Sequence, residues 1–188
     1  GGSFLIPFID SVEKECLIRG VSYEVLSSEK AESILKEIQS PSKNMDAVTL
    51  EKAPKIAVYS PNGKQPWDDA VTMVLTYAEI PYETIYDTEV LNDALLLYDW
   101  LHLHHEDFTG QYGKFYRAYR NAAWYIEQQQ AAEALASSLG YIKVSDQKLA
   151  VAEKIREYVL GGGFMFAMCS ATDSFDIALA AQELDICE

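Results

Sequence analysis

Residues 155–171, with the sequence IREYVLGGGFMFAMCSA, decide the fold that we expect for this chain. They continue a helical pattern that begins at residue 147 and ends at Gly161, since a glycine commonly ends a helix. The uncharged run 163–168 then predicts a strand that is buried on both faces. Cys169 follows in a short turn that leads into another helical pattern. Helix, strand, turn and helix in this order predict one unit of a parallel α/β sheet.

The same alternation of strand and helix patterns runs through the chain from Pro54 onward. Short apolar runs predict strands, and longer runs with apolar residues every three or four positions predict helices. Strands are predicted over residues 55–60, 82–86, 98–103 and 163–168, and helices from Pro66 onward and over residues 116–139, 147–160 and 174–184. Strands that are apolar on both faces are typical of a parallel sheet covered by helices on both sides. We therefore expect a three-layer α/β domain over residues 54–188.

The first 53 residues have a different pattern. A short apolar run over residues 4–9, a helical pattern over 11–19 and an alternating run over 21–26 predict a small βαβ-like unit. A second helix with a serine at its start follows, and then a polar linker over residues 40–53. The chain opens without an initiator methionine and stops directly after a helical pattern. We therefore expect a piece of a longer protein, with other domains of that protein as partners.

The charge balance narrows the classes of partner. The chain has 15 Lys and Arg residues against 29 Asp and Glu residues, for a formal net charge of −14 and a pI near 4.5. So acidic a molecule repels phosphate backbones and anionic lipid surfaces, and we expect neither nucleic acid nor a membrane as its partner. Apolar residues make up 49% of the chain, which is enough to build a core and excludes an acidic disordered chain.

The cysteines and the apolar runs bear on the compartment. Cys16, Cys169 and Cys187 are an odd number and form no CxxC pair, which indicates free thiols in a reducing compartment. No uncharged apolar stretch approaches the about 18 residues that cross a membrane. The N-terminus lacks the layout of a secretion signal. We expect a cytoplasmic protein by default, or a periplasmic or envelope protein if a signal lies upstream.

Cys169 is the first candidate catalytic residue. It lies where a predicted central strand ends and a helix begins, at the sheet edge where open α/β folds bind ligands. A helix N-terminus also stabilises a thiolate, which is the nucleophilic form of cysteine. Ala167 and Ala171 are small, as are the residues that flank a nucleophile on such a turn. The alternative is a buried and inert cysteine.

The second candidate is a cluster in which every histidine of the chain lies within four positions at the end of a predicted strand. The cluster consists of His102, His104, His105, Glu106 and Asp107. Imidazole nitrogens and carboxylate oxygens bind divalent metals, and His102, His104 and Glu106 are the candidate ligands. Alternatively His104 or His105 is a base for Cys169, because the histidines and the cysteine follow two strands that are expected to be neighbours. The third interpretation is a hydrogen-bonded polar rim without chemistry.

Trp67 and Asp68 lie at the start of the helix after the first strand, and therefore at the same edge of the sheet. A tryptophan there can stack on a planar ligand or can simply pack the loop, and an aspartate favours a helix N-terminus in either case. The residues expected to contact a small polar molecule at this edge are Trp67, Asp68, Glu106, Asp107 and Ser170.

From Pro54 to Leu184 the chain resembles the class I glutamine amidotransferase-like domain, whose fold is flavodoxin-like. The resemblance rests on KIAVYS (55–60), LYDWLHLH (97–104) and IREYVLGGGFMFAMCSA (155–171). It implies that Cys169 is a nucleophile. Three segments also resemble uncharacterised bacterial proteins that often carry the label asparagine synthetase B, namely QPWDDAV (65–71), YDWLHLHHEDFTGQYGKF (98–115) and GGGFMFAMCSATDSFD (161–176).

The chain departs from the family pattern around the nucleophile. Alanines replace the glycines that flank the cysteine in working amidotransferases, and His104-His105-Glu106 replaces the Gly-Gly of the oxyanion hole. The family's catalytic His and Glu come from a later strand, whereas every histidine here precedes Cys169.

These departures favour an amidotransferase-like domain that binds a small polar ligand without assured catalysis. The alternatives are an amide or ester hydrolase, or an amidotransferase, that acts through Cys169, and a structural domain of a larger protein. A divalent metal is the one cofactor that the residues suggest.

Overall fold

The computed structural model describes residues 4–43, 53–61, 69–105, 112–182 and 184. The chain divides into two compact units, Gly1–Ala53 and Pro54–Glu188. The first unit contains α1 (Asp10–Arg19), α2 (Ser28–Ile38) and a short 3-10 helix, η1 (Pro41–Lys43). The side chain of Ser27 caps α2 by accepting a hydrogen bond from the backbone N–H of Lys30.

The predicted βαβ-like unit is wrong. Residues 4–9 and 21–26 are not strands, and no residue between 4 and 42 is buried. A strand needs a hydrogen-bonded neighbour, and two short strands have too little apolar surface to hold one another in place. The helix between them forms because its hydrogen bonds are local.

The second unit contains a four-stranded sheet, which confirms the α/β class. The strands are β1 (Ile56–Tyr59), β2 (Glu83–Ile85), β3 (Trp100–Leu103) and β4 (Phe164–Ala167), and each lies within a predicted run. All three pairings are parallel, in the order β2-β1-β3-β4. In register, Val58 lies opposite His102, and His102 lies opposite Phe166.

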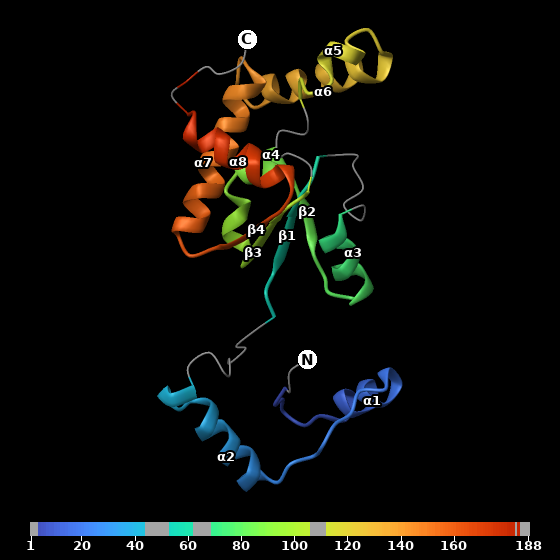
Figure 1. The fold of residues 1–188 in the computed structure, drawn as a ribbon, viewed down its shortest axis with the longest axis vertical. Coiled ribbons are helices and arrows are strands. Elements are labelled where there is room, and N and C mark those ends of the chain that lie inside the picture. Colours follow the sequence, from blue (N-terminus) through green and yellow to red (C-terminus); the bar gives the residue numbers. More distant parts are fainter. Residues whose placement is uncertain (1–3, 44–52, 62–68, 106–111, 183, 185–188) are drawn as a thin grey trace. The chain divides into compact units, whose positions relative to one another are not determined.

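Helices lie on both sides of this sheet (Figure 1). One side has α3 (Ala70–Tyr77), and the other has α4 (Asp87–Leu91), α7 (Val144–Leu160) and α8 (Ser170–Ala180). The helices α5 (Tyr116–Tyr119) and α6 (Ala123–Ser138) precede α7, and η3 (Ala94–Leu97) precedes β3. The arrangement is consistent with a three-layer α/β fold.

The core lies between the sheet and α7. Tyr59, Leu101 and Leu103 project to this side and are at most 1% exposed, and they pack in one cluster with Val151 and Ile155 of α7. Burying a side chain of this size stabilises the fold by about 1.5–3 kcal/mol. This packing fixes the helix that leads into β4, and so it positions the turn at the end of that strand.

The predicted helix over residues 116–139 is interrupted. Ala122 is extended, with ψ 133°, and α6 begins after it. The break lets the rings of Tyr119 and Trp124 pack 5.2 Å apart. In a continuous helix, residues five apart point in different directions and do not meet.

A second buried cluster joins the strand ends to α4 and α7. Lys148 Nζ donates to Asp87 over 2.6 Å and to the hydroxyl of Tyr86 over 2.7 Å, and the lysine side chain is 7% exposed. Tyr59 and Gln147 also donate hydrogen bonds to Asp87. Because both charged groups have several partners, this cluster fastens β1 to the two helices.

Candidate functional site

The site is built around Asp69, the residue before α3. Its Oδ1 accepts hydrogen bonds from the backbone N–H groups of Val71 (2.7 Å) and Thr72 (3.3 Å), so the carboxylate caps the helix. Asp69 is completely buried. A buried carboxylate is costly unless it is well paired, and the remaining partners come from another strand.

His102 on β3 holds Asp69 from the sheet. Its Nε2 lies 3.1 Å from Asp69 Oδ1, and its Nδ1 lies 3.2 Å from the carbonyl oxygen of Phe166. The side chain is fully buried. Burial lowers the pKa of His102 below its ordinary value, although the Asp69 carboxylate opposes this effect. With a partner beside each of its nitrogens, the buried ring is a rigid support for the carboxylate.

His104 and His105 follow β3 and lie against the other oxygen of Asp69. The backbone N–H of His105 donates to Asp69 Oδ2 over 2.8 Å, and His105 Nδ1 lies 3.4 Å from the same oxygen. The two histidine rings are 4.5 Å apart. Burial alone would raise the pKa of Asp69, but the hydrogen bond from His105 and the proximity of His102 hold it below its ordinary value.

The turn after β4 contacts the segment that holds His104 and His105. Ser170 Oγ donates a hydrogen bond to the carbonyl oxygen of His105 over 3.1 Å. Cys169 is exposed and precedes the first residue of α8, with φ 59° and ψ −142°. Such a backbone is rare for a residue with a Cβ and is typical of strained functional turns. Among the described residues the Cys169 thiol has no hydrogen-bond partner.

These residues meet where the direction of strand addition reverses. The strand order puts β2 on one side of β1, and β3 on the other side. Asp69 lies after β1, and His104 follows β3, so both lie beyond the C-terminal ends of adjacent strands. In open α/β sheets this crevice is where ligands bind.

The structure brings together some of the predicted site residues. His104, His105 and Ser170 lie in one cluster, with Cys169 at its border. His102 is present as a support for Asp69, and Asp69, not His102, shares a group of potential metal ligands with His104 and His105. Trp67, Asp68, Glu106 and Asp107 lie outside the described residues.

Asp69 is not among the site residues that the sequence predicts. The sequence predicts a helix from Pro66 onward, whereas α3 begins at Ala70, directly after Asp69. The missed signal is an aspartate directly before an apolar helical run, which is typical of an N-cap. The contacts with His102 and His105, 33 and 36 residues away, have no local signal.

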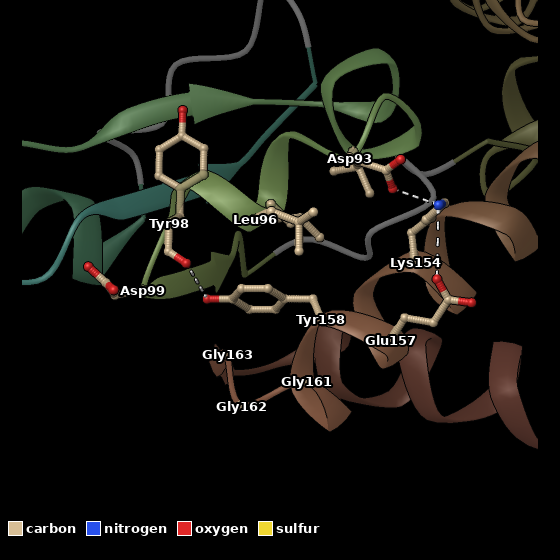
Figure 2. A pocket seen from close by; sticks show the side chains of 12 residues that line it. Asp93, Leu96, Tyr98, Asp99, Lys154, Glu157, Tyr158, Gly161, Gly162 and Gly163 are labelled. Atoms are coloured by element: carbon tan, nitrogen blue, oxygen red, sulfur yellow. Dashed lines mark hydrogen bonds and ion pairs between the residues drawn. The ribbon is translucent and has the colours of Figure 1, made fainter.

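A cavity of about 510 Å³ opens at the opposite end of the sheet (Figure 2). Its lining includes Asp93, Asp99, Lys154 and Tyr158, with the glycine turn before β4. Its polar groups are already paired, since Lys154 Nζ lies 2.6 Å from Asp93 and Asp99 accepts a hydrogen bond from the backbone of Lys55. The cavity is therefore large, but its polar side chains already have partners within the protein. The candidate catalytic and metal-binding residues lie at the other edge of the sheet.

Comparison of the chain with protein-family models, curated proteins and solved structures found no match. Within the described ranges, every helix is too short or too polar to cross a membrane.

Replacing Cys169 by glycine is expected to raise the free energy of unfolding by about 1 kcal/mol. The strained backbone costs roughly 1–3 kcal/mol at a residue with a Cβ, and glycine relieves it at an entropic cost of about 0.5–1 kcal/mol. Urea denaturation measures the change. Cys169→Ala is the matched control, because it removes the thiol and keeps the Cβ, and its stability should stay near that of the wild type. A Cys169→Gly variant less stable than Cys169→Ala would contradict stored strain.

Proposed function

We propose that residues 54–188 are a flavodoxin-like, class I glutamine amidotransferase-like domain that binds a small polar molecule at the C-terminal edge of its sheet. The binding site comprises Asp69, His104, His105 and Ser170, with Cys169 at its border. The observation that carries this proposal is a chain of hydrogen bonds, in which the buried Asp69 carboxylate accepts from the backbone of His105 and the carbonyl of His105 accepts from Ser170.

The polar contacts of these residues support a built site. Asp69 binds the backbone of His105 on one side and the ring of His102 on the other. Ser170 in turn binds the carbonyl of His105. Hydrogen bonds thus link one residue after each of β1, β3 and β4, namely Asp69, His105 and Ser170, and binding residues are often held on a rigid scaffold in this way.

The strand order supports the finer fold assignment. Flavodoxin-like sheets have the order 2-1-3-4-5, and the order β2-β1-β3-β4 is the same over the described strands. The crevice between the first and third strands is where such sheets bind their ligands. Fold likeness by itself leaves the chemistry open, so the proposal depends on the residues that line the crevice.

The test is a titration of the isotope-labelled full chain with small polar molecules, followed by amide chemical shifts in NMR spectra. The panel contains primary amides, amino acids, hydroxy acids and sugars. We expect at least one class to shift the signals of Val71, His105 and Ser170 saturably. Ser170→Ala should weaken that binding, because it removes the link to His105. Ser138→Ala is the matched control, since the Ser138 hydroxyl donates to a carbonyl within α6, away from this edge.

Shifts confined to the cavity at the other end of the sheet would contradict this placement. So would equal affinities of the Ser170→Ala and Ser138→Ala variants for the same molecule.

A second candidate function is acyl transfer through Cys169. The positive φ of Cys169 and its place at the start of α8 favour it, because this backbone exposes a nucleophile at the top of a sheet. In this reaction the Cys169 thiolate attacks an amide or ester carbonyl, the amine or alcohol leaves with a proton, and water hydrolyses the thioester. His104 and His105 are the candidate bases.

The alkylation rate of Cys169 separates this candidate from a binding domain. With iodoacetamide at neutral pH, an activated Cys169 should react at least about 10-fold faster than Cys16, which lies in the first unit and serves as the internal control. Equal rates for the two thiols would contradict nucleophilic catalysis and leave the binding proposal unaffected.

A further inference from the structure

We infer that Asp69, His104 and His105 bind a divalent first-row transition metal ion, which then holds the small polar molecule by its oxygen or nitrogen atoms. The inference rests on the proposed binding function of the same edge and names the chemistry by which the edge would bind.

The spacing of the three side chains suits a metal ion. Each offers one ligand atom, and the three atoms lie within 4.8 Å of one another. Metal–ligand bonds of about 2.0–2.1 Å place the ligands of a tetrahedral ion about 3.3 Å apart. Asp69 Oδ2 and His105 Nδ1 are already 3.4 Å apart. The ligand atom of His104 lies no more than 4.8 Å from the other two, so closing the set requires an approach of at most about 1.5 Å.

One nitrogen of this cluster lacks an ordinary partner. His105 Nδ1 is buried and makes no hydrogen bond within the part of the chain that the structure describes, although its ring is 37% exposed. Buried polar atoms are nearly always hydrogen-bonded, so a buried atom without a hydrogen bond indicates a partner such as a bound ion. A metal ion at this nitrogen would satisfy it, and the exposed part of the ring leaves a path for the ion to enter.

The two oxygens of Asp69 have separate roles. Oδ1 accepts hydrogen bonds from the start of α3 and lies beside the His102 ring. Oδ2 faces the loop after β3, beside the ring of His105. Ligating carboxylates in proteins are commonly held by just such outer contacts, which fix the orientation of the oxygen that binds the metal. His102 therefore supports the site as a positioning residue.

The ligand types decide the class of metal. Two imidazole nitrogens and one carboxylate oxygen suit Zn²⁺, Fe²⁺ or Co²⁺, whereas Mg²⁺ and Ca²⁺ prefer oxygen ligands alone. Three protein ligands leave at least one coordination position open. That position is where a carboxylate, hydroxyl or amide of the small molecule would bind.

The test is calorimetric titration of Zn²⁺ into the full chain after treatment with a chelator, together with the visible spectrum of the Co²⁺ form. We expect one ion per chain. His105→Ala removes an exposed ring and keeps the backbone N–H that binds Asp69, so the fold should survive. It should weaken binding by more than about 100-fold, since even outer-shell changes cost 10–100-fold.

Two further variants identify the ligands. Asp69→Asn keeps a helix cap and loses the charge, so it should also weaken Zn²⁺ binding, whereas the matched Asp93→Asn at the other end of the sheet should not. Circular dichroism of each variant shows whether it has folded.

Absence of saturable Zn²⁺ binding, equal affinity in His105→Ala, or loss of binding in Asp93→Asn would each overturn the metal site. Binding of a small polar molecule by the chelator-treated chain, with shifts at Val71 and Ser170, would still uphold the proposed function. The two proposals therefore fail by different results.

Discussion

Replacement of Lys148 by methionine is expected to lower the free energy of unfolding by about 3–5 kcal/mol, because it leaves the Asp87 carboxylate buried without its cation. Asp87 is 1% exposed, and Lys148 Nζ lies 2.6 Å from its Oδ2. The hydroxyl of Tyr59 and the amide of Gln147 remain, but neutral donors do not balance a buried charge. Urea denaturation followed by circular dichroism measures the loss.

Lys154→Met is the matched control for this substitution. Lys154 lies on the same helix and also pairs with an aspartate, with Nζ 2.6 Å from Asp93, but its side chain is 35% exposed and that of Asp93 is 59% exposed. Exposed ion pairs contribute about 0–1 kcal/mol. Equal losses in the two variants would contradict the importance of burial.

A double variant tests the reason for the loss. In Lys148→Met with Asp87→Leu no charge is left buried, and apolar replacements of a buried pair are often neutral or stabilising. The double variant should therefore be more stable than Lys148→Met alone. If it is less stable, the ion pair itself stabilises the fold, and the loss in the single variant does not come from an unpaired carboxylate.

Replacement of Gly163 by alanine is the second large effect, with an expected loss of about 2 kcal/mol from overpacking. A Cβ at Gly163 would lie 2.5 Å from Cε1 of Tyr158 and closer still to two other atoms of the ring. Tyr158 is 7% exposed, and its hydroxyl donates to the carbonyl oxygen of Tyr98 over 3.3 Å (Figure 2). The ring must move for the alanine to fit, and this hydrogen bond must break or lengthen.

Gly161→Ala is the control for this steric effect. Gly161 has a right-handed helical backbone that alanine adopts readily, and the nearest atom to an added Cβ is a carbonyl oxygen at 3.3 Å. Its stability should stay within about 0.5 kcal/mol of the wild type. A second check combines Gly163→Ala with Tyr158→Leu, whose effects should be less than additive if the two residues collide. Additive losses would contradict the clash.

The positions of the strands followed from the sequence alone. KIAVYS and GGGFMFAM are short, apolar and bounded by turn residues, so each predicts a strand locally. The prediction that residues 163–168 form a central strand buried on both faces was wrong, because β4 is the edge strand of the described sheet and Phe164 and Phe166 are exposed. The parallel sheet followed from their alternation with helical patterns. The same reasoning failed at residues 4–9 and 21–26, because whether a strand forms depends on a neighbour and a buried face, and neither is visible in a short apolar run.

The residue types at the C-terminal edge of the sheet were also predictable from the sequence. It placed Cys169 at a strand-to-helix turn and placed all the histidines at the end of one strand. The tertiary structure decided which of them meet, since Asp69 and His105 are 36 residues apart, and Asp87 and Lys148 are 61 apart. A local sequence pattern predicts whether a segment is a helix or a strand. It does not predict the partners of a buried carboxylate, because those come from distant segments. Such contacts form only when the strands pair and the helices pack in the folded chain.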